Sequence, residues 1–187
     1  MKIGIDIDDT VSKTNERLIE EALKYDREYV KGKGFKDPEA YSFMEMFYWS
    51  VVDVDNFLKR FRKGTAFYEL EEKEEAPLYI SKLYDEGNEI YFITRRQNTM
   101  KMKSMTKKWL KKKGFKYNKI FMEIRNKGEF CHNLDIDIFI DNDEKNVYEA
   151  LEYKIDSLLM ATKYNEDVED LRKVHNWKEI YDYIKEK

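Results

Sequence analysis

Short apolar runs bounded by polar residues recur along the chain and predict five β-strands. The runs are rich in isoleucine, phenylalanine, tyrosine or leucine, and they span residues 2–7, 89–94, 119–122, 136–141 and 157–161. In the first run, Ile3, Ile5 and Ile7 show the β-branched alternation that is typical of a strand. The pattern therefore predicts a sheet whose strands are distributed over most of the chain.

Helical periodicity separates these runs. Residues 76–84 and 98–113 each place their apolar side chains on one face, and Gly114 is suited to end the second helix. Strands that alternate with helices of this length indicate βαβ units and a parallel sheet. We therefore expect an α/β fold with a parallel sheet flanked by helices.

The interval between the first two strands is much longer than the others. It holds about eighty residues, whereas a crossover between parallel strands needs a dozen or so. Its apolar periodicity predicts a helical insertion over residues 14–72, and residues 1–13 and 73–187 would form the core domain. Because open α/β sheets bind ligands at the carboxyl ends of their strands, an insertion that begins there would serve as a cap or lid.

Composition limits the class of protein. The 187 residues suit one domain with a modest insertion, and the net charge of −3 gives no field that would favour nucleic acid or an anionic membrane as a partner. The single cysteine, Cys131, excludes an intrachain disulfide and suits a reducing compartment. With no long apolar run and no signal peptide, the expected location is cytoplasmic. A homodimer is one of the assemblies that the sequence leaves open.

Two acidic residues follow the first predicted strand. A period of two sends Asp6 and Asp8 of Asp6-Ile7-Asp8-Asp9-Thr10 to the same side, where two carboxylates repel each other. Mg²⁺, which prefers oxygen ligands, would relieve that repulsion. One carboxylate could then attack a phosphoryl group while the other moves protons. The alternative is an acidic turn or helix cap that merely ends the strand.

Further polar groups are expected at the same sheet edge. Thr94 ends the second strand and could bind a phosphoryl oxygen, or it could cap the next turn. Lys127 precedes a short helix, an unfavourable place for a cation unless it faces an anion. Asp141 ends the fourth strand, and Asn142 and Asp143 follow it, where they could support the site or cap the next helix. Together, these groups predict a phosphoryl-transfer site.

These residues resemble the four motifs of the haloacid dehalogenase superfamily of phosphatases. Asp6-Ile7-Asp8-Asp9-Thr10 matches the DxDxT first motif, and Thr94, Lys127 and Asp141 match the second, third and fourth. More narrowly, the chain is similar to the 5′(3′)-deoxyribonucleotidase family. The resemblance implies a Rossmann-like core, a helical cap inserted after the first motif, and dependence on Mg²⁺.

The resemblance also implies roles. Asp6 would be the nucleophile that forms an aspartyl-phosphate, and Asp8 would protonate the leaving sugar oxygen and then accept a proton from water. The Asp6 side chain, the Asp8 main-chain carbonyl and Asp141 would hold Mg²⁺. Thr94 and Lys127 would hold the phosphoryl oxygens. The implied activity is a phosphomonoesterase for deoxynucleoside or nucleoside monophosphates.

Two departures from the family pattern bear on the substrate. Many relatives carry a second Asp where this chain has Asn142, which lowers the negative charge of the site. Asp143 could restore that charge without itself contacting the metal. Arg95 and Arg96 follow Thr94, where some relatives have a small residue, and a guanidinium could bind a further phosphate or carboxylate of the substrate.

Aromatic residues of the insertion have two interpretations. They could stack on a nucleobase of the substrate, or they could form the core of the insertion. The sequence leaves this choice open for Phe43, Phe47, Trp49 and Phe67.

Two other functions fit part of the pattern. A phosphatase for another small metabolite would use the same motifs. A phospho-acceptor signalling domain would need an acceptor Asp at the end of a middle strand, and Asp53 or Asp55 would be the candidate, but this leaves Asp6 and the insertion unexplained. The sequence does not determine the base or the sugar of a nucleotide substrate.

Overall fold

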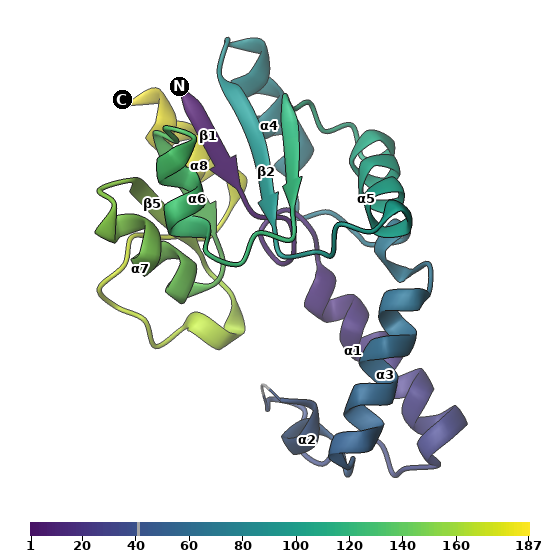
Figure 1. Ribbon diagram of the computed structural model, residues 1–187. Helices are drawn as coiled ribbons and strands as arrows, with labels where there is room; N and C mark the ends of the chain where they lie inside the picture. Colours follow the sequence, from purple (N-terminus) through teal and green to yellow (C-terminus); the bar gives the residue numbers. More distant parts are fainter. Residues whose placement is uncertain (41) are drawn as a thin grey trace. The chain divides into compact units, whose positions relative to one another are not determined.

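The core of the fold is a parallel six-stranded sheet, as the alternating pattern predicts. We describe residues 1–40 and 42–187 from a computed structural model (Figure 1). The strands lie in the order β3-β2-β1-β4-β5-β6, and all neighbours pair in parallel. Their bounds are β1 (Lys2–Ile5), β2 (Glu89–Thr94), β3 (Lys119–Met122), β4 (Ile138–Asp141), β5 (Asp156–Met160) and β6 (Lys173–Val174).

The first strand is shorter than predicted, because a tight turn follows it. Asp6 N still donates to Ile140 O at 2.9 Å, but the carbonyl of Ile7 then accepts hydrogen bonds from Val11 N and Ser12 N within the turn. Asp9 adopts a positive φ of 58° in the same turn. The prediction that the strand continues to Ile7 is therefore wrong, and Asp8 belongs to a turn. The short strand β6 was not predicted.

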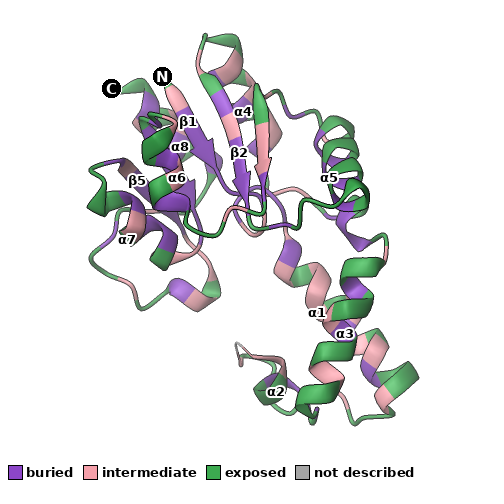
Figure 2. Ribbon diagram, viewed as in Figure 1, coloured by how far each residue is buried: buried purple, intermediate pink, exposed green. Residues whose placement is uncertain are grey.

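Helices cover both faces of the sheet. Helices α6 and α7 pack together on one face, and their side chains share a buried cluster with Ile93 and Phe139. On the other face α4 packs against α8, and Trp109 of α5 contacts Phe115, which in turn contacts Phe92 of β2. The helices are α4 (Ala76–Asp85), α5 (Met100–Lys112), α6 (Lys127–Asn133), α7 (Glu144–Glu152) and α8 (Trp177–Lys185), with a 3₁₀ turn at Lys163–Asn165. Figure 2 shows the strands β1 and β2 mostly buried and the outer side of α5 exposed.

Contacts divide the described residues into two units. One comprises Met1–Lys13 and Glu71–Lys187, and the other comprises Thr14–Leu70, within which residue 41 lies outside the described residues. The second unit is helical. Its elements are α1 (Thr14–Tyr25), a π-helical turn (Asp26–Val30), α2 (Phe43–Met46), α3 (Val51–Lys63) and a 3₁₀ turn (Ala66–Tyr68).

The second unit has an aromatic core. The Phe47 and Trp49 rings stack with centroids 4.6 Å apart, and Phe57 lies edge-on to Trp49 at 5.4 Å. Phe47, Trp49 and Phe67 are buried, whereas Phe43 is half-buried and stacks on Trp49. The Trp49 indole N–H also donates to the buried carboxylate of Asp26 at 2.7 Å. Phe47, Trp49 and Phe67 therefore lie where residues that form the core of the insertion would lie.

The residues that a signalling domain would need do not follow a strand. Asp53 and Asp55 lie in α3, and Asp53 closes a capping box with Ser50 at the start of that helix. Within residues 1–40 and 42–187, no helix has both the length and the apolar character that crossing a bilayer requires.

Candidate active site

Three polar residues end neighbouring strands at one edge of the sheet. Asp6 follows β1, Thr94 ends β2 and Asp141 ends β4. Strand β1 lies between β2 and β4, where the strand order reverses, and this is the place where open α/β sheets bind ligands. All three residues are at least nine-tenths buried.

Lys127 joins two of these carboxylates. Its ammonium Nζ donates to Asp6 Oδ1 and, at 2.8 Å, to Asp141 Oδ2. The three side chains are 2%, 7% and 1% exposed, so the cluster is almost completely removed from water. Lys127 is the first residue of α6, and that helix lies close to α7: a Cβ on Gly128 would come within 2.5 Å of the Glu149 backbone. Close packing of two helices thus delivers the ammonium to the sheet edge.

The cluster holds more negative than positive charge. Burial raises the pKa of the Asp6 carboxyl to about 7, Lys127 opposes this rise, and the carboxylates of Asp141 and Asp8 add to it. Burial by itself would lower the pKa of Lys127, but Asp141 and Asp6 outweigh burial and raise it above its ordinary value. Lys127 is therefore a cation, and one cation faces two buried carboxylates.

Asp141 has further partners. Its Oδ1 accepts from Asp143 N at 2.9 Å, and its Oδ2 accepts from Asn146 Nδ2 at 3.0 Å. Sequence reasoning missed Asn146, because an asparagine in the first turn of a helix gives no sign of which residue it will meet. Asp143 caps α7 by accepting from Lys145 N at 3.1 Å. Asp143 thus both caps the helix and supports Asp141 through its backbone.

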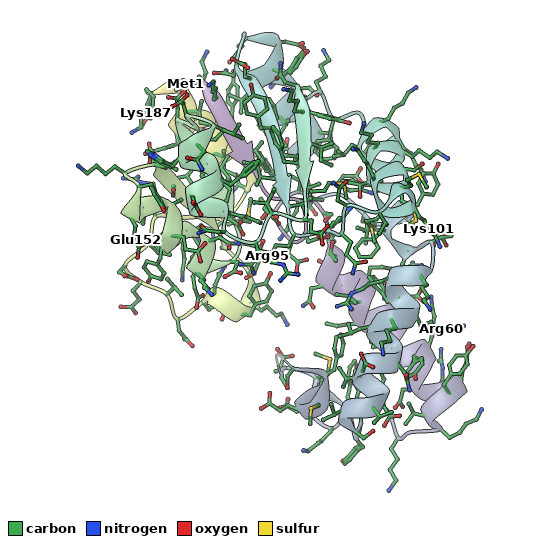
Figure 3. The ribbon with its side chains drawn as sticks, in the orientation of Figure 1. Met1, Arg60, Arg95, Lys101, Glu152 and Lys187 are labelled. Carbon is green, nitrogen blue, oxygen red and sulfur yellow. The ribbon has the colours of Figure 1, made fainter. Side chains whose placement is uncertain are left out.

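The two arginines after Thr94 lie in different environments. Arg95, labelled in Figure 3, is exposed at the end of β2 and donates to Asp143 Oδ2 at 3.0 Å and Asn146 Oδ1 at 2.8 Å. Arg96 is buried, and its guanidinium binds the carboxylate of Asp8. In this structure the guanidinium groups bind acidic and amide side chains of the chain itself, where the sequence suggested an anionic group of the substrate.

Hydrogen bonds also place the remaining predicted residues. The Thr94 hydroxyl accepts from Arg96 N at 3.2 Å. The Thr10 hydroxyl donates to Asn142 Oδ1 at 2.9 Å, and Asn142 Nδ2 donates to the Tyr164 hydroxyl. That hydroxyl in turn donates to Asp9 Oδ2 at 3.1 Å. Asn142 therefore ties the turn after β1 to the loop after β5, a role that Tyr164 shares and that the sequence did not indicate.

The side chains at this sheet edge supply only part of the oxygen ligands that a hard divalent cation needs. Among residues 1–40 and 42–187, no group of three or more His, Cys, Asp or Glu side chains is arranged to hold a metal ion. The Asp8 carboxylate lies against Arg96, so the Asp8 side chain does not join those of Asp6 and Asp141. The set implied by the resemblance uses the main-chain carbonyl of Asp8, so it needs only the two carboxylates that lie together at Lys127. Their excess negative charge suits Mg²⁺.

Comparison with known proteins gives a family match over the whole chain. The family described as 5′ nucleotidase, deoxy (pyrimidine), cytosolic type C protein matches residues 1–187. No curated protein matches the chain in a direct sequence search.

Solved structures resemble the whole chain at low sequence identity. A haloacid dehalogenase-like hydrolase of Streptococcus pneumoniae is 15% identical with a TM-score of 0.69, and the match covers 98% of this chain and 97% of that one. A protein of Clostridium acetobutylicum described as a predicted phosphatase is 17% identical with a TM-score of 0.67, and the match covers 100% of this chain and 98% of that one. The hydrolase YfnB of Bacillus subtilis, described as bound to magnesium, is 13% identical with a TM-score of 0.70, covering 98% of each chain. These likenesses show that the Rossmann-like α/β fold of the haloacid dehalogenase hydrolases is present here.

Proposed function

The chain belongs to the family of 5′ nucleotidases, deoxy (pyrimidine), cytosolic type C, which are phosphoric monoester hydrolases, and from this premise we propose that it hydrolyses deoxynucleoside or nucleoside monophosphates with Mg²⁺. The observation that carries the proposal is the buried contact of Lys127 with both Asp6 and Asp141. A buried ammonium between two carboxylates at a strand edge is costly as a purely structural device, and it suits a site that receives a dianionic phosphoryl group.

Asp6 is the nucleophile in this proposal. Its carboxylate oxygen forms a bond to phosphorus while the bond from phosphorus to the ester oxygen breaks, which gives an aspartyl-phosphate. Lys127, which donates to Asp6, would also neutralise charge on the transferring oxygens. Thr94, buried at the end of the neighbouring strand, would donate its hydroxyl to one of those oxygens.

Asp8 moves the protons. It gives a proton to the departing ester oxygen, and in the second half of the reaction it takes one from the water that attacks phosphorus. That attack releases inorganic phosphate and restores the Asp6 carboxylate. Asp8 is close enough to Asp6 for its charge to act on the Asp6 carboxyl, so both groups can reach one bound ester.

Mg²⁺ would be held by the carboxylates of Asp6 and Asp141 and by the main-chain carbonyl of Asp8, and it would supply positive charge to the phosphoryl oxygens. The buried site has two carboxylates and one ammonium, and this imbalance supports the need for a further cation. Asn146 and the backbone of Asp143 orient Asp141 for this purpose.

The substrate class rests on the family. A nucleotide as the small phosphorylated partner, with no nucleic acid or membrane partner, agrees with the net charge of −3. We further propose that Thr14–Leu70 acts as the cap, since it is inserted directly after the turn that carries Asp8. A cytoplasmic location is supported by the single, free and buried cysteine. Light scattering in solution would test whether the chain forms a homodimer.

The test is phosphate release from a panel of esters with Mg²⁺. The panel holds deoxy and ribo forms of pyrimidine and purine monophosphates, several sugar phosphates and para-nitrophenyl phosphate. We expect repeated turnover, preference for nucleotides, loss of more than about 1000-fold in Asp6→Asn, and loss of turnover with a chelator. Asp85→Asn, which alters an exposed partner of Lys116, is the matched control and should keep full activity.

Each result has a distinct meaning. Preference for a sugar phosphate would replace the nucleotide by another metabolite. A single stoichiometric phosphorylation without turnover would support a phospho-acceptor domain, and turnover that survives in Asp6→Asn would contradict the role of Asp6.

A further inference from the structure

We propose that Arg96 is a positioning residue that fixes the carboxylate of Asp8 for proton transfer. The inference rests on the proposed function, because it gives Arg96 a part in the reaction through Asp8. Nothing in the four motifs assigns a role to this position.

The contact between the two side chains is bidentate. Arg96 Nη2 donates to Asp8 Oδ1 at 2.6 Å, and Arg96 Nε donates to Asp8 Oδ2 at 2.9 Å and to Oδ1 at 3.2 Å. A planar guanidinium that meets both oxygens fixes the rotation of the carboxylate as well as its place. A lysine ammonium at the same place would act as a point charge and would not fix the rotation of that carboxylate.

Arg96 itself is anchored at several points. Its backbone N–H donates to the Thr94 hydroxyl at 3.2 Å, and its carbonyl accepts from Glu123 N at 2.8 Å. Its Nη1 donates to the Thr106 hydroxyl at 3.2 Å, and its guanidinium lies 6.0 Å from the centre of the Trp109 ring. The Arg96 backbone is therefore held by the ends of β2 and β3 and its guanidinium by α5, so the guanidinium can act as a rigid support.

Asp8 needs such a support because of where it lies. Strand β1 ends at Ile5, so the sheet ladder does not hold Asp8, which lies in the turn where Asp9 has a positive φ. A carboxylate on a turn samples several rotamers, and small misplacement of a reacting group costs large factors in rate.

Exposure separates a positioning role from a purely structural ion pair. The Arg96 side chain is 2% exposed, whereas that of Asp8 is 31% exposed. The pair is thus buried on the arginine side and accessible on the aspartate side. Each carboxylate oxygen has a second lone pair, so Asp8 can exchange a proton with a substrate oxygen or a water while Arg96 holds it.

The inference has a consequence for each half of the reaction. When Asp6 attacks phosphorus and the ester bond breaks, the leaving oxygen takes the proton from Asp8. Water then attacks the aspartyl-phosphate, its proton goes to Asp8, and the bond between phosphorus and Asp6 breaks. A misplaced Asp8 slows the first half most for esters whose leaving oxygen must be protonated.

The experiment compares two kinds of ester with Arg96→Lys in the full chain. 2,4-Dinitrophenyl phosphate has a leaving group that needs no proton, and dUMP and β-glycerophosphate have alkoxide leaving groups that do. We measure kcat/KM, which reports the steps up to departure of the leaving group. General acid catalysis contributes about 100- to 10,000-fold, so we expect the loss with the alkyl esters to exceed the loss with the aryl ester by about tenfold or more.

Two further variants keep the test decisive. Arg172→Lys makes the same change at an exposed arginine that packs on Tyr183, and it should leave both rates unchanged. If Arg96→Lys does not fold, as judged by circular dichroism, Thr106→Val carries the test, because it removes only the hydroxyl that accepts from Arg96 Nη1. It should produce a smaller difference in the same direction.

Three results would overturn the inference. Equal losses with aryl and alkyl esters, or no loss, would mean that Arg96 is merely structural. A wild-type protein that hydrolyses only the activated ester would mean that Asp8 gives no proton to the leaving group. A wild-type protein that hydrolyses neither kind of ester would overturn the proposed function itself.

Discussion

Replacing Lys127 by methionine should destabilise the larger unit strongly. The substitution keeps much of the side-chain volume but removes the ammonium that donates to Asp6 and Asp141. All three side chains are less than 10% exposed, so two carboxylates would remain buried without their cation. Removing one partner of a buried ion pair costs about 3–5 kcal/mol. At about 2–4 °C per kcal/mol for a chain of this size, Tm should fall by roughly 6–20 °C.

Urea unfolding in the presence of a chelator measures this loss without a divalent ion. Fluorescence reports mainly on the larger unit, because two of the three tryptophans, Trp109 and Trp177, are buried in it. Asp6→Asn combined with Lys127→Met removes one of the two stranded charges and should recover about 1–3 kcal/mol, a non-additive result expected of contacting residues. Lys116→Met, at an exposed ion pair with Asp85, is the control and should change stability by less than about 1 kcal/mol.

A loss of less than about 1 kcal/mol in Lys127→Met would refute this reasoning, because it would mean that the two carboxylates do not depend on the ammonium. Additive effects in the double variant would refute the specific coupling between Asp6 and Lys127.

Three other predictions concern packing and thiol chemistry. Gly128→Ala should lower the free energy of unfolding by about 1–3 kcal/mol in urea titrations, because its Cβ would lie 2.5 Å from the Glu149 backbone; an unchanged midpoint would contradict the packing of α6 on α7. Cys131 is buried, and burial raises the pKa of its thiol to about 12, so at pH 8 only about one thiol in ten thousand is ionised. Cys131 should therefore react with a disulfide reagent only after denaturant is added. Rapid labelling of the native protein would count against this. Trp49→Phe removes the indole N–H that donates to the buried Asp26 carboxylate, which should lower the free energy of unfolding by about 1–3 kcal/mol. Limited proteolysis should then cleave the variant earlier within residues 14–70. Resistance equal to that of the wild type would show that this hydrogen bond is dispensable.

The contacts of Asp8 show why part of the site could not be predicted. The sequence places Asp8 near Asp6 by the period of a strand, but the strand ends at Ile5 and a turn carries Asp8 to Arg96. Arg96 is 88 residues away along the chain, and no local pattern indicates which acidic residue it will meet. The same holds for Asn146, whose amide reaches Asp141 only because α7 starts beside the end of β4.

The sequence alone determined the alternation of strands and helices, the long insertion, and the polar residues at or directly after the ends of β1, β2 and β4. Those features follow from short-range periodicity, because the side-chain direction in a strand or helix repeats every two or about 3.6 residues. Tertiary structure decided which of those polar groups meet: Lys127 with Asp6 and Asp141, and Arg96 with Asp8. Such pairings depend on the order of the strands in the sheet and on the packing of helices across it, which bring together residues that no repeat in the sequence relates.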